Sequence, residues 1–185
     1  MMRVGWRRLL LATVAAIGIA TVSSCSSTSS EVPPVLAGDL ANLSYKLKDM
    51  NGQEVNLASF KGRPIILNFW ATWCGPCKAE IPMLMALADQ YRDRQLAVLG
   101  VSVDDSPEDL RKFAEEFKMN YPVLVGLGQH EFQEKFEAVV AIPVTWFIRP
   151  DGTVLKKHQG PASKDWFESQ VKAMLAASPA KPEAN

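Results

Sequence analysis

The chain has few cysteines and no surplus of either charge. Its 185 residues include three cysteines, and 20 basic residues balance 20 acidic ones. Three cysteines are too few for a disulfide scaffold, and a net charge of zero gives no electrostatic reason to expect nucleic acid as a partner. Hydrophobic residues make up 48% of the chain. That content excludes a chain disordered throughout and suffices for the core of one domain.

The balanced total hides an asymmetric N-terminus. Residues 1–24 contain three arginines and no acid, and the 14 residues from Leu9 to Val22 are all apolar or small. A membrane-spanning helix needs about 20 apolar residues, so this shorter run behind a basic start predicts a secretory signal peptide over 1–24. After its removal, 17 basic residues would face 20 acidic ones, and the mature chain would be mildly acidic.

The apolar run ends at a cysteine. Val22-Ser23-Ser24-Cys25 resembles the lipobox of bacterial lipoproteins, and the resemblance implies cleavage before Cys25 and a lipid on its thiol. A plain signal peptide with an incidental cysteine and an uncleaved anchor are the alternatives. The polar tract 26–30 suits a flexible tether. We therefore expect the lipidated cysteine and a linker over 25–42, and a disordered tail over 179–185.

Between linker and tail, the apolar pattern predicts one α/β domain over 43–178. Asn51-Gly52 separates two alternating segments and predicts a β-hairpin. Residues 64–70 form a nearly continuous apolar run, which is typical of a strand buried on both faces. The order of elements predicts a mixed central sheet flanked by helices. After the first strand we expect helix 75–93, strand 96–103, a helix from Ser106 to Phe117, strand 121–125, helix 130–138, strands 144–148 and 153–157, and a helix capped by Ser163.

Cys74-Gly75-Pro76-Cys77 follows the buried strand and opens the next helix. Free amides and the dipole at a helix N-terminus stabilise a thiolate. We therefore expect Cys74, at the exposed first position, to attack a disulfide, and Cys77 to resolve the mixed disulfide. An inert structural disulfide is one alternative. A zinc site is another, but it needs about four ligands, and only His130 and His158, both expected at the surface, could complete it.

The surroundings of the pair resemble the active site of thioredoxins. Residues 69–77 read FWATWCGPC. The segments 77–82 and 141–152 resemble the active-site helix and the proline loop of membrane-tethered, thioredoxin-like thiol–disulfide oxidoreductases of the TlpA/ResA kind. The likeness covers about 43–178. It implies a thioredoxin-like fold in which the helix and strand at 106–125 are an insertion.

The resemblance also implies roles for residues beside the pair. Pro143 matches the family's cis-proline, with an ordinary trans turn proline as the alternative. The backbone of Ile142, just before it, would pair with the substrate chain. Trp73, as an exposed contact surface, together with Gly75 and Pro76 would complete the substrate-binding residues.

Asn68 departs from the family pattern, because thioredoxins usually have a buried aspartate at this strand position. Asparagine cannot titrate. Glu80 lies three residues beyond Cys77 on the same helix face, and a partly buried carboxylate has a raised pKa and could accept the proton of the resolving thiol. The resemblance points to Glu80 for the same task. The alternative is a solvated glutamate paired with Lys78 or Arg92.

The sequence thus predicts a thiol–disulfide oxidoreductase with no cofactor beyond the cysteine pair and no bound metal. Reduction of protein disulfides is the favoured direction, because Gly75-Pro76 matches the reducing thioredoxins. We expect it in the bacterial cell envelope, lipid-anchored to a membrane and facing the periplasm or the cell exterior. Expected partners are protein disulfide or dithiol substrates and a membrane electron donor, with cytochrome c maturation among the candidate pathways. We expect a monomer.

Two other functions compete with this prediction. A non-catalytic lipoprotein could bind partners or deliver a metal, although copper-delivery relatives of this fold have a longer cysteine spacing and a nearby histidine. A thiol peroxidase shares the fold, but the usual proline–threonine–cysteine arrangement is not reproduced around Cys74. The direction of electron flow does not follow from the sequence, since about 30 mV corresponds to only 1.4 kcal/mol.

Overall fold

The computed structural model describes residues 37–138 and 141–176. The expected signal peptide, Cys25, most of the expected linker and the expected tail lie outside these residues. Within the described ranges, no helix combines the length and the apolar character that crossing a membrane requires.

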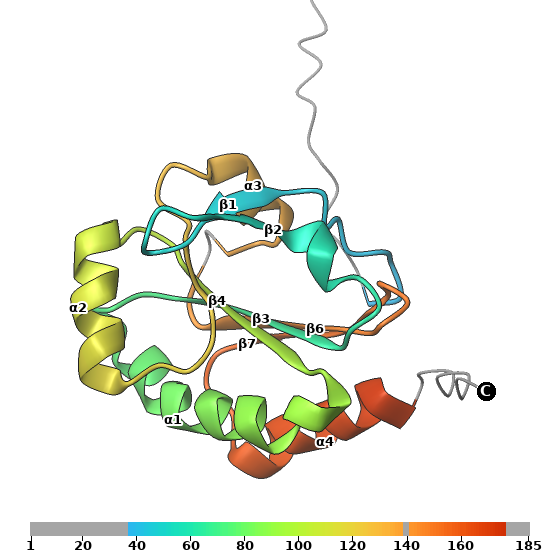
Figure 1. Cartoon of the computed structure of the whole chain (residues 1–185). Coiled ribbons are helices and arrows are strands. Elements are labelled where there is room, and N and C mark those ends of the chain that lie inside the picture. The colour runs from blue at the N-terminus through green and yellow to red at the C-terminus, as the bar shows by residue number, and fades with distance from the viewer. Residues whose placement is uncertain (1–36, 139–140, 177–185) are drawn as a thin grey trace, which may run out of the picture. The chain divides into compact units, whose positions relative to one another are not determined.

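A five-stranded mixed sheet forms the centre of the domain (Figure 1). Its strand order is β5-β4-β3-β6-β7, in which β6 is antiparallel to both of its neighbours and β3, β4 and β5 run parallel. All six residues of the central strand β3 are buried, which confirms a strand covered on both faces. The strands are β3 (Ile65–Trp70), β4 (Ala97–Ser102), β5 (Val123–Val125), β6 (Val144–Ile148) and β7 (Val154–Gln159).

Helices and a hairpin cover the two faces of this sheet (Figure 1). The helices α1 (Gly75–Gln90) and α4 (Lys164–Ala176) lie on one face. The hairpin of β1 (Lys46–Lys48) and β2 (Glu54–Asn56) lies on the other face with α3 (His130–Lys135). The helix α2 (Pro107–Phe117) and β5 form the insertion expected at 106–125. Together with the hairpin, this arrangement confirms the predicted thioredoxin-like fold class.

Local signals in the sequence mark the starts of α2 and α4. The Ser106 hydroxyl accepts a hydrogen bond from the Asp109 amide at 3.1 Å and caps α2, and the Ser163 hydroxyl accepts one from the Trp166 amide at 3.2 Å at the start of α4. The helix α1 ends at Gln90, three residues before the predicted end at 93. A short 3₁₀ turn follows it, and Gln95 adopts a left-handed conformation with φ 58° that redirects the chain into β4.

Residues 38–41 are part of the folded domain, although the sequence placed them in the linker. The Gly38 amide donates to the Val154 carbonyl at 2.7 Å, and the Val154 amide donates to the Asp39 carbonyl at 2.8 Å. These bonds attach the segment to the edge strand β7, whose other side pairs with β6. The ordered domain therefore begins before residue 43.

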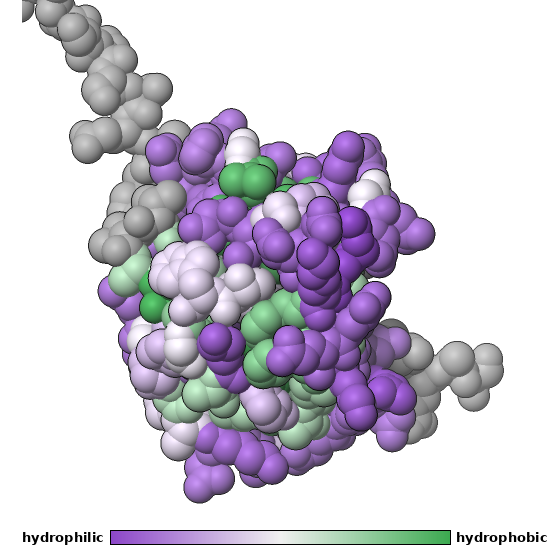
Figure 2. Space-filling model, turned by 90° about the vertical axis from the view of Figure 1, so that its left-hand side faces the viewer, coloured by the Kyte–Doolittle hydropathy of each residue, from purple (hydrophilic) through white to green (hydrophobic). Residues whose placement is uncertain are grey.

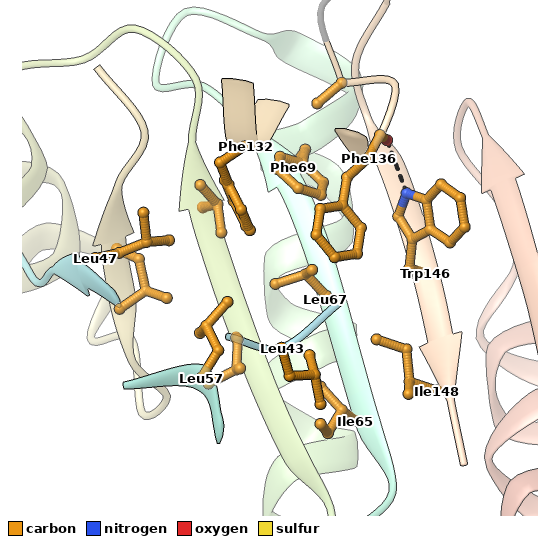
Figure 3. Packing of buried hydrophobic residues seen from close by; sticks show 14 of the residues in the cluster. Leu43, Leu47, Leu57, Ile65, Leu67, Phe69, Phe132, Phe136, Trp146 and Ile148 are labelled. Atoms are coloured by element: carbon orange, nitrogen blue, oxygen red, sulfur yellow. Dashed lines mark hydrogen bonds between the residues drawn. The ribbon is translucent and has the colours of Figure 1, made fainter. Parts of the chain in front are cut away.

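The core between the sheet and the hairpin is apolar (Figure 3). Phe69 on β3 packs against Phe132 and Phe136, with ring centroids 5.6 and 5.9 Å apart. The indole of Trp146 donates its N–H to the Phe136 carbonyl at 2.9 Å. A buried indole nitrogen needs such a partner, and this bond joins the residue that follows α3 to β6.

Candidate active site

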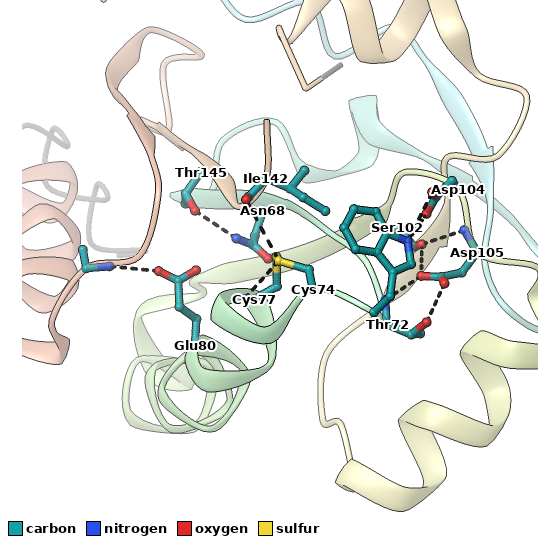
Figure 4. The surroundings of a disulfide bond; sticks show 12 residues. Asn68, Thr72, Cys74, Cys77, Glu80, Ser102, Asp104, Asp105, Ile142 and Thr145 are labelled. Atoms are coloured by element: carbon teal, nitrogen blue, oxygen red, sulfur yellow. Dashed lines mark hydrogen bonds between the residues drawn. A yellow bond between two sulfur atoms is a disulfide. The ribbon is translucent and has the colours of Figure 1, made fainter. Parts of the chain in front are cut away.

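The disulfide between Cys74 and Cys77 lies at the start of α1, directly after β3 (Figure 4). Cys74 is the N-cap of the helix, and its Sγ accepts a hydrogen bond from the Cys77 amide at 3.3 Å. Pro76 occupies the first turn, where its missing N–H costs nothing. An amide directed at Sγ of Cys74 stabilises negative charge on that sulfur, as the nucleophile of the pair requires.

Both cysteines are more enclosed than the sequence suggests. Cys74 is 5% exposed and Cys77 is 2% exposed, so the expectation of an exposed first cysteine is wrong. Both side chains belong to the apolar cluster that includes Trp70 and Ile81. Trp73, by contrast, is 63% exposed, as expected of a contact surface beside the pair.

The proline loop closes over the disulfide. The peptide bond between Ile142 and Pro143 is cis, which confirms the cis-proline expected from the resemblance. The Ile142 carbonyl oxygen lies 4.0 Å from Cys74 Sγ. The structure thus brings together two segments that are 68 residues apart in the chain.

Two aspartates that the sequence reasoning missed hold the loop before Cys74. The buried Asp105 carboxylate accepts from the Thr72 amide at 2.8 Å and from the Ser102 hydroxyl at 2.6 Å. The exposed Asp104 carboxylate accepts from the Trp73 indole N–H, with oxygen distances of 3.0 and 3.2 Å. Both follow β4, and the carboxyl ends of parallel strands are where such folds gather functional groups. The position of these two aspartates directly after a predicted strand could therefore have marked them as candidates from the sequence.

Asn68 on β3 lies beside the disulfide and is buried (Figure 4). Its side-chain amide donates to Thr145 Oγ1 on β6 at 2.9 Å. Asn68 and Thr145 are direct partners across the two antiparallel strands, so both side chains face α1. The position that usually titrates in the family is therefore a neutral hydrogen-bonded pair in this chain.

Glu80 is buried, and the alternative of a solvated glutamate is wrong. Its side chain is 3% exposed, and Oε1 accepts a hydrogen bond from the Ala162 amide at 3.1 Å. Among the described residues, Oε2 is buried without a hydrogen-bond partner. Burial raises the pKa of Glu80 from 4.5 to about 7, although the Ala162 amide acts in the opposite direction.

The two histidines differ in their exposure to solvent. His130 is exposed, as expected. His158 was also expected at the surface, but it is partly buried and its ring centroid lies 4.3 Å from that of Trp166. Its pairing partner across the sheet is Thr145, which places it on the helix-covered face, where α4 shields it.

The chain is similar in sequence to a described protein family and to a thiol-disulfide oxidoreductase. A model described as the AhpC/TSA family matches residues 38–157. Thiol-disulfide oxidoreductase ResA of Oceanobacillus iheyensis is 29% identical over 166 residues, covering 88% of this chain and 84% of that protein.

The fold of this chain is also similar to solved structures of thioredoxin-family proteins. A thiol:disulfide interchange protein of the thioredoxin family from Chlorobium tepidum has 27% identity and a TM-score of 0.65, covering 78% of this chain and 99% of that one. The pneumococcal exposed lipoprotein thioredoxin of Streptococcus pneumoniae has 28% identity and a TM-score of 0.61, covering 70% of this chain and 98% of that one.

Proposed function

Because the chain belongs to the AhpC/TSA family and is a thiol–disulfide oxidoreductase, we propose that it reduces disulfides of other proteins outside the cytoplasm. The observation that carries this proposal is the Cys74–Cys77 disulfide at the start of α1, with Cys74 Sγ 4.0 Å from the Ile142 carbonyl oxygen. The pair alternates between dithiol and disulfide. It therefore supplies both electrons of the reaction without a diffusible cofactor.

The reaction runs in two exchanges. The Cys74 thiolate of the reduced enzyme attacks a substrate disulfide, so that one substrate sulfur leaves as a thiolate and the other is bonded to Cys74. Cys77 then loses its proton and attacks Cys74 Sγ. This step forms the disulfide seen here and releases the second substrate thiolate. The substrate gains two electrons, and the cysteine pair loses two.

Glu80 fits the role of proton acceptor for Cys77. It lies one helical turn beyond that cysteine, and residues with this spacing are neighbours on a helix surface. With a pKa of about 7 it is partly ionised at neutral pH, which is the range in which a general base works best. Asn68 leaves β3 without a competing titratable group at this position.

The substrate chain docks on the loops around Cys74. The backbone of Ile142 pairs with the extended substrate segment, and Pro143 fixes the direction of that backbone. Trp73, Gly75 and Pro76 are exposed beside the sulfur and provide the remaining contact surface.

The enzyme is tethered to a membrane of the bacterial envelope through a lipid on Cys25 and faces the periplasm or the cell exterior. The Val22–Cys25 pattern supports this location, as does the likeness to an exposed lipoprotein thioredoxin. Such compartments favour disulfides, so a reductant needs a membrane protein as its electron donor. Apocytochrome haem-site cysteines are one class of substrate that fits. The domain acts as a monomer.

The reduction potential of the chain tests the direction of electron flow. A value near that of thioredoxin, about −270 mV, supports a reductant, whereas a value near about −120 mV would make the protein an oxidant. The measurement is equilibration with a glutathione or dithiothreitol redox series, read out by mass after alkylation.

A trapping experiment tests the catalytic assignment. Cys77→Ala should accumulate a mixed disulfide between Cys74 and its substrates, because the resolving thiol is gone, and a reductant should release the captured proteins. Cys74→Ala is the matched control and should capture nothing. If neither variant forms adducts while both remain folded, a non-catalytic binding module replaces the enzyme. Consumption of hydrogen peroxide at rates above those for disulfides would favour the peroxidase.

The anchor has its own test. Cys25→Ala should move the protein from the membrane fraction to the soluble fraction and leave its reductase activity unchanged, because the expected tether separates anchor and site. A variant that stays in the membrane would point to an uncleaved N-terminal anchor.

A further inference from the structure

A groove of about 520 Å³ lies beside the disulfide. Its walls include Trp73 from the loop before Cys74, Val103 and Asp104 after β4, and Ala141 and Ile142 from the proline loop. In the view of Figure 4, Ile142 and Asp104 lie on the same side of the disulfide. The Ile142 carbonyl contacts Cys74 Sγ at 4.0 Å, so a chain bonded to this sulfur reaches the groove within a residue or two.

The lining of the groove is apolar except at two positions. One is Gln133, whose side-chain NH2 group donates to the carbonyls of Val103 and Gly126 at 2.8 and 2.7 Å. Asp104 is therefore the one charged side chain among the residues found to line the groove. On the side of the domain that carries α2, hydrophobic side chains are exposed only in patches between hydrophilic ones (Figure 2).

Asp104 is held in place and still has free acceptor capacity. Both of its oxygens lie within 3.2 Å of the Trp73 indole nitrogen, which carries a single hydrogen. A carboxylate offers about four lone-pair sites, so the exposed side of Asp104 remains available to a second donor. The same bond fixes the exposed Trp73 ring next to this charge.

We propose that the groove binds the substrate segment next to the reactive cysteine, and that Asp104 selects segments carrying lysine or arginine there. This inference rests on the proposed function. A long basic side chain matches both parts of the site, because its apolar stem covers the Trp73 ring while its charged end reaches the carboxylate. Complementary charge of this kind sets specificity and association rate more than affinity.

The size of the preference follows from the exposure of Asp104. An ion pair open to solvent changes binding by a factor of about two to five, and salt screens it over about 10 Å at 0.1 M. An acidic side chain at the same place is repelled by a similar factor. We therefore expect a basic peptide to react about fivefold faster than its acidic counterpart at low salt, and this ratio should shrink as salt is added.

The experiment uses pre-reduced full-length protein in single turnover and three peptides. Each peptide carries one cysteine as a mixed disulfide with methanethiol, and they differ only in having lysine, glutamine or glutamate at the positions flanking that cysteine. Asp104→Asn keeps an oxygen for the Trp73 indole and removes the charge. Asp93→Asn is the matched control, since Asp93 is an exposed acid beyond the far end of α1. Peptide thiol release is measured after acid quench.

The wild type and Asp93→Asn should prefer the lysine peptide about fivefold over the glutamate peptide, and Asp104→Asn should react with both at nearly equal rates. Equal rates in the wild type, or an undiminished ratio in Asp104→Asn, would overturn the inference. A wild type that prefers the glutamine peptide over both others would also overturn it, because the groove would then select against charge of either sign. If the glutamine peptide is not reduced at all, the proposed function itself fails, which separates the two outcomes.

Discussion

The two faces of the central sheet bury different kinds of side chain near the cysteine pair and near the hairpin. Between the sheet and the hairpin, the buried side chains are apolar and aromatic. Between the sheet and α1, the buried set includes Asn68, Thr145, Glu80 and both cysteines. The helix-covered face also has an apolar core, but near the start of α1 it places polar groups next to the disulfide.

A single strand serves both faces. Side chains of a strand alternate between its two sides, so Ile65, Leu67 and Phe69 enter the apolar core, and Asn68 and Trp70 face α1. The nearly continuous apolar run of this strand therefore conceals a functional position. Changes on the hairpin side should therefore alter stability without altering the chemistry of the cysteine pair.

The largest loss of stability is expected on the apolar face. Leu57→Ala should lower the free energy of unfolding by about 2–5 kcal/mol, because Leu57 is fully buried and its truncation leaves a cavity. The rate at which Cys74 reacts with an alkylating reagent should not change. Chemical denaturation and thiol labelling measure the two quantities. A parallel change in both would show that the faces are not independent.

The chemistry of the other face depends most on Glu80. Glu80→Gln should slow the reduction of a disulfide substrate by roughly 10²-fold and flatten its pH profile around pH 7, because the amide cannot accept a proton. A pH–rate comparison with the wild type is the measurement, with the exposed Glu115→Gln as control. Superimposed profiles would mean that water carries the proton.

The same substitution should change how stability depends on pH. Burial raises the pKa of Glu80 from 4.5 to about 7, so the folded state binds this proton more tightly than the unfolded state. Stability from this group is present below pH 4.5 and is lost as pH rises through 7. Relative to the wild type, oxidised Glu80→Gln should therefore gain up to about 3 kcal/mol between pH 4 and pH 8. A constant difference would argue against a buried, titrating carboxyl.

The smallest effect is expected at the hydrogen bond between the two inner strands. Thr145→Val removes the acceptor of the Asn68 side-chain amide and should cost about 1–3 kcal/mol, because a buried donor is left without a partner. Adding Asn68→Leu removes that donor and should recover much of the loss. If the double variant is no more stable than the single one, the pair contributes through packing and not through its hydrogen bond.

Most elements of the fold follow from the sequence, and each error has an identifiable physical cause. The order of strands and helices and the Ser106 cap depend on neighbouring residues, so they were predictable. The end of α1 was placed three residues too far, because the left-handed Gln95 has no sequence signature. His158 was misassigned because its burial depends on Trp166, which comes from another element.

The sequence by itself determined the cysteine pair and its place at a helix start, because both belong to a short motif whose residues interact over a few positions. The cis-proline was expected only from the family resemblance, and the structure shows it. Only the tertiary structure decided what surrounds the pair. The approach of Ile142 to Cys74, the bond from Trp73 to Asp104 and the burial of Glu80 against Ala162 join residues from 31 to 82 positions apart. Such contacts depend on how strands and helices pack, because packing sets the distances and the loss of water that shift a pKa or hold a charge beside a groove.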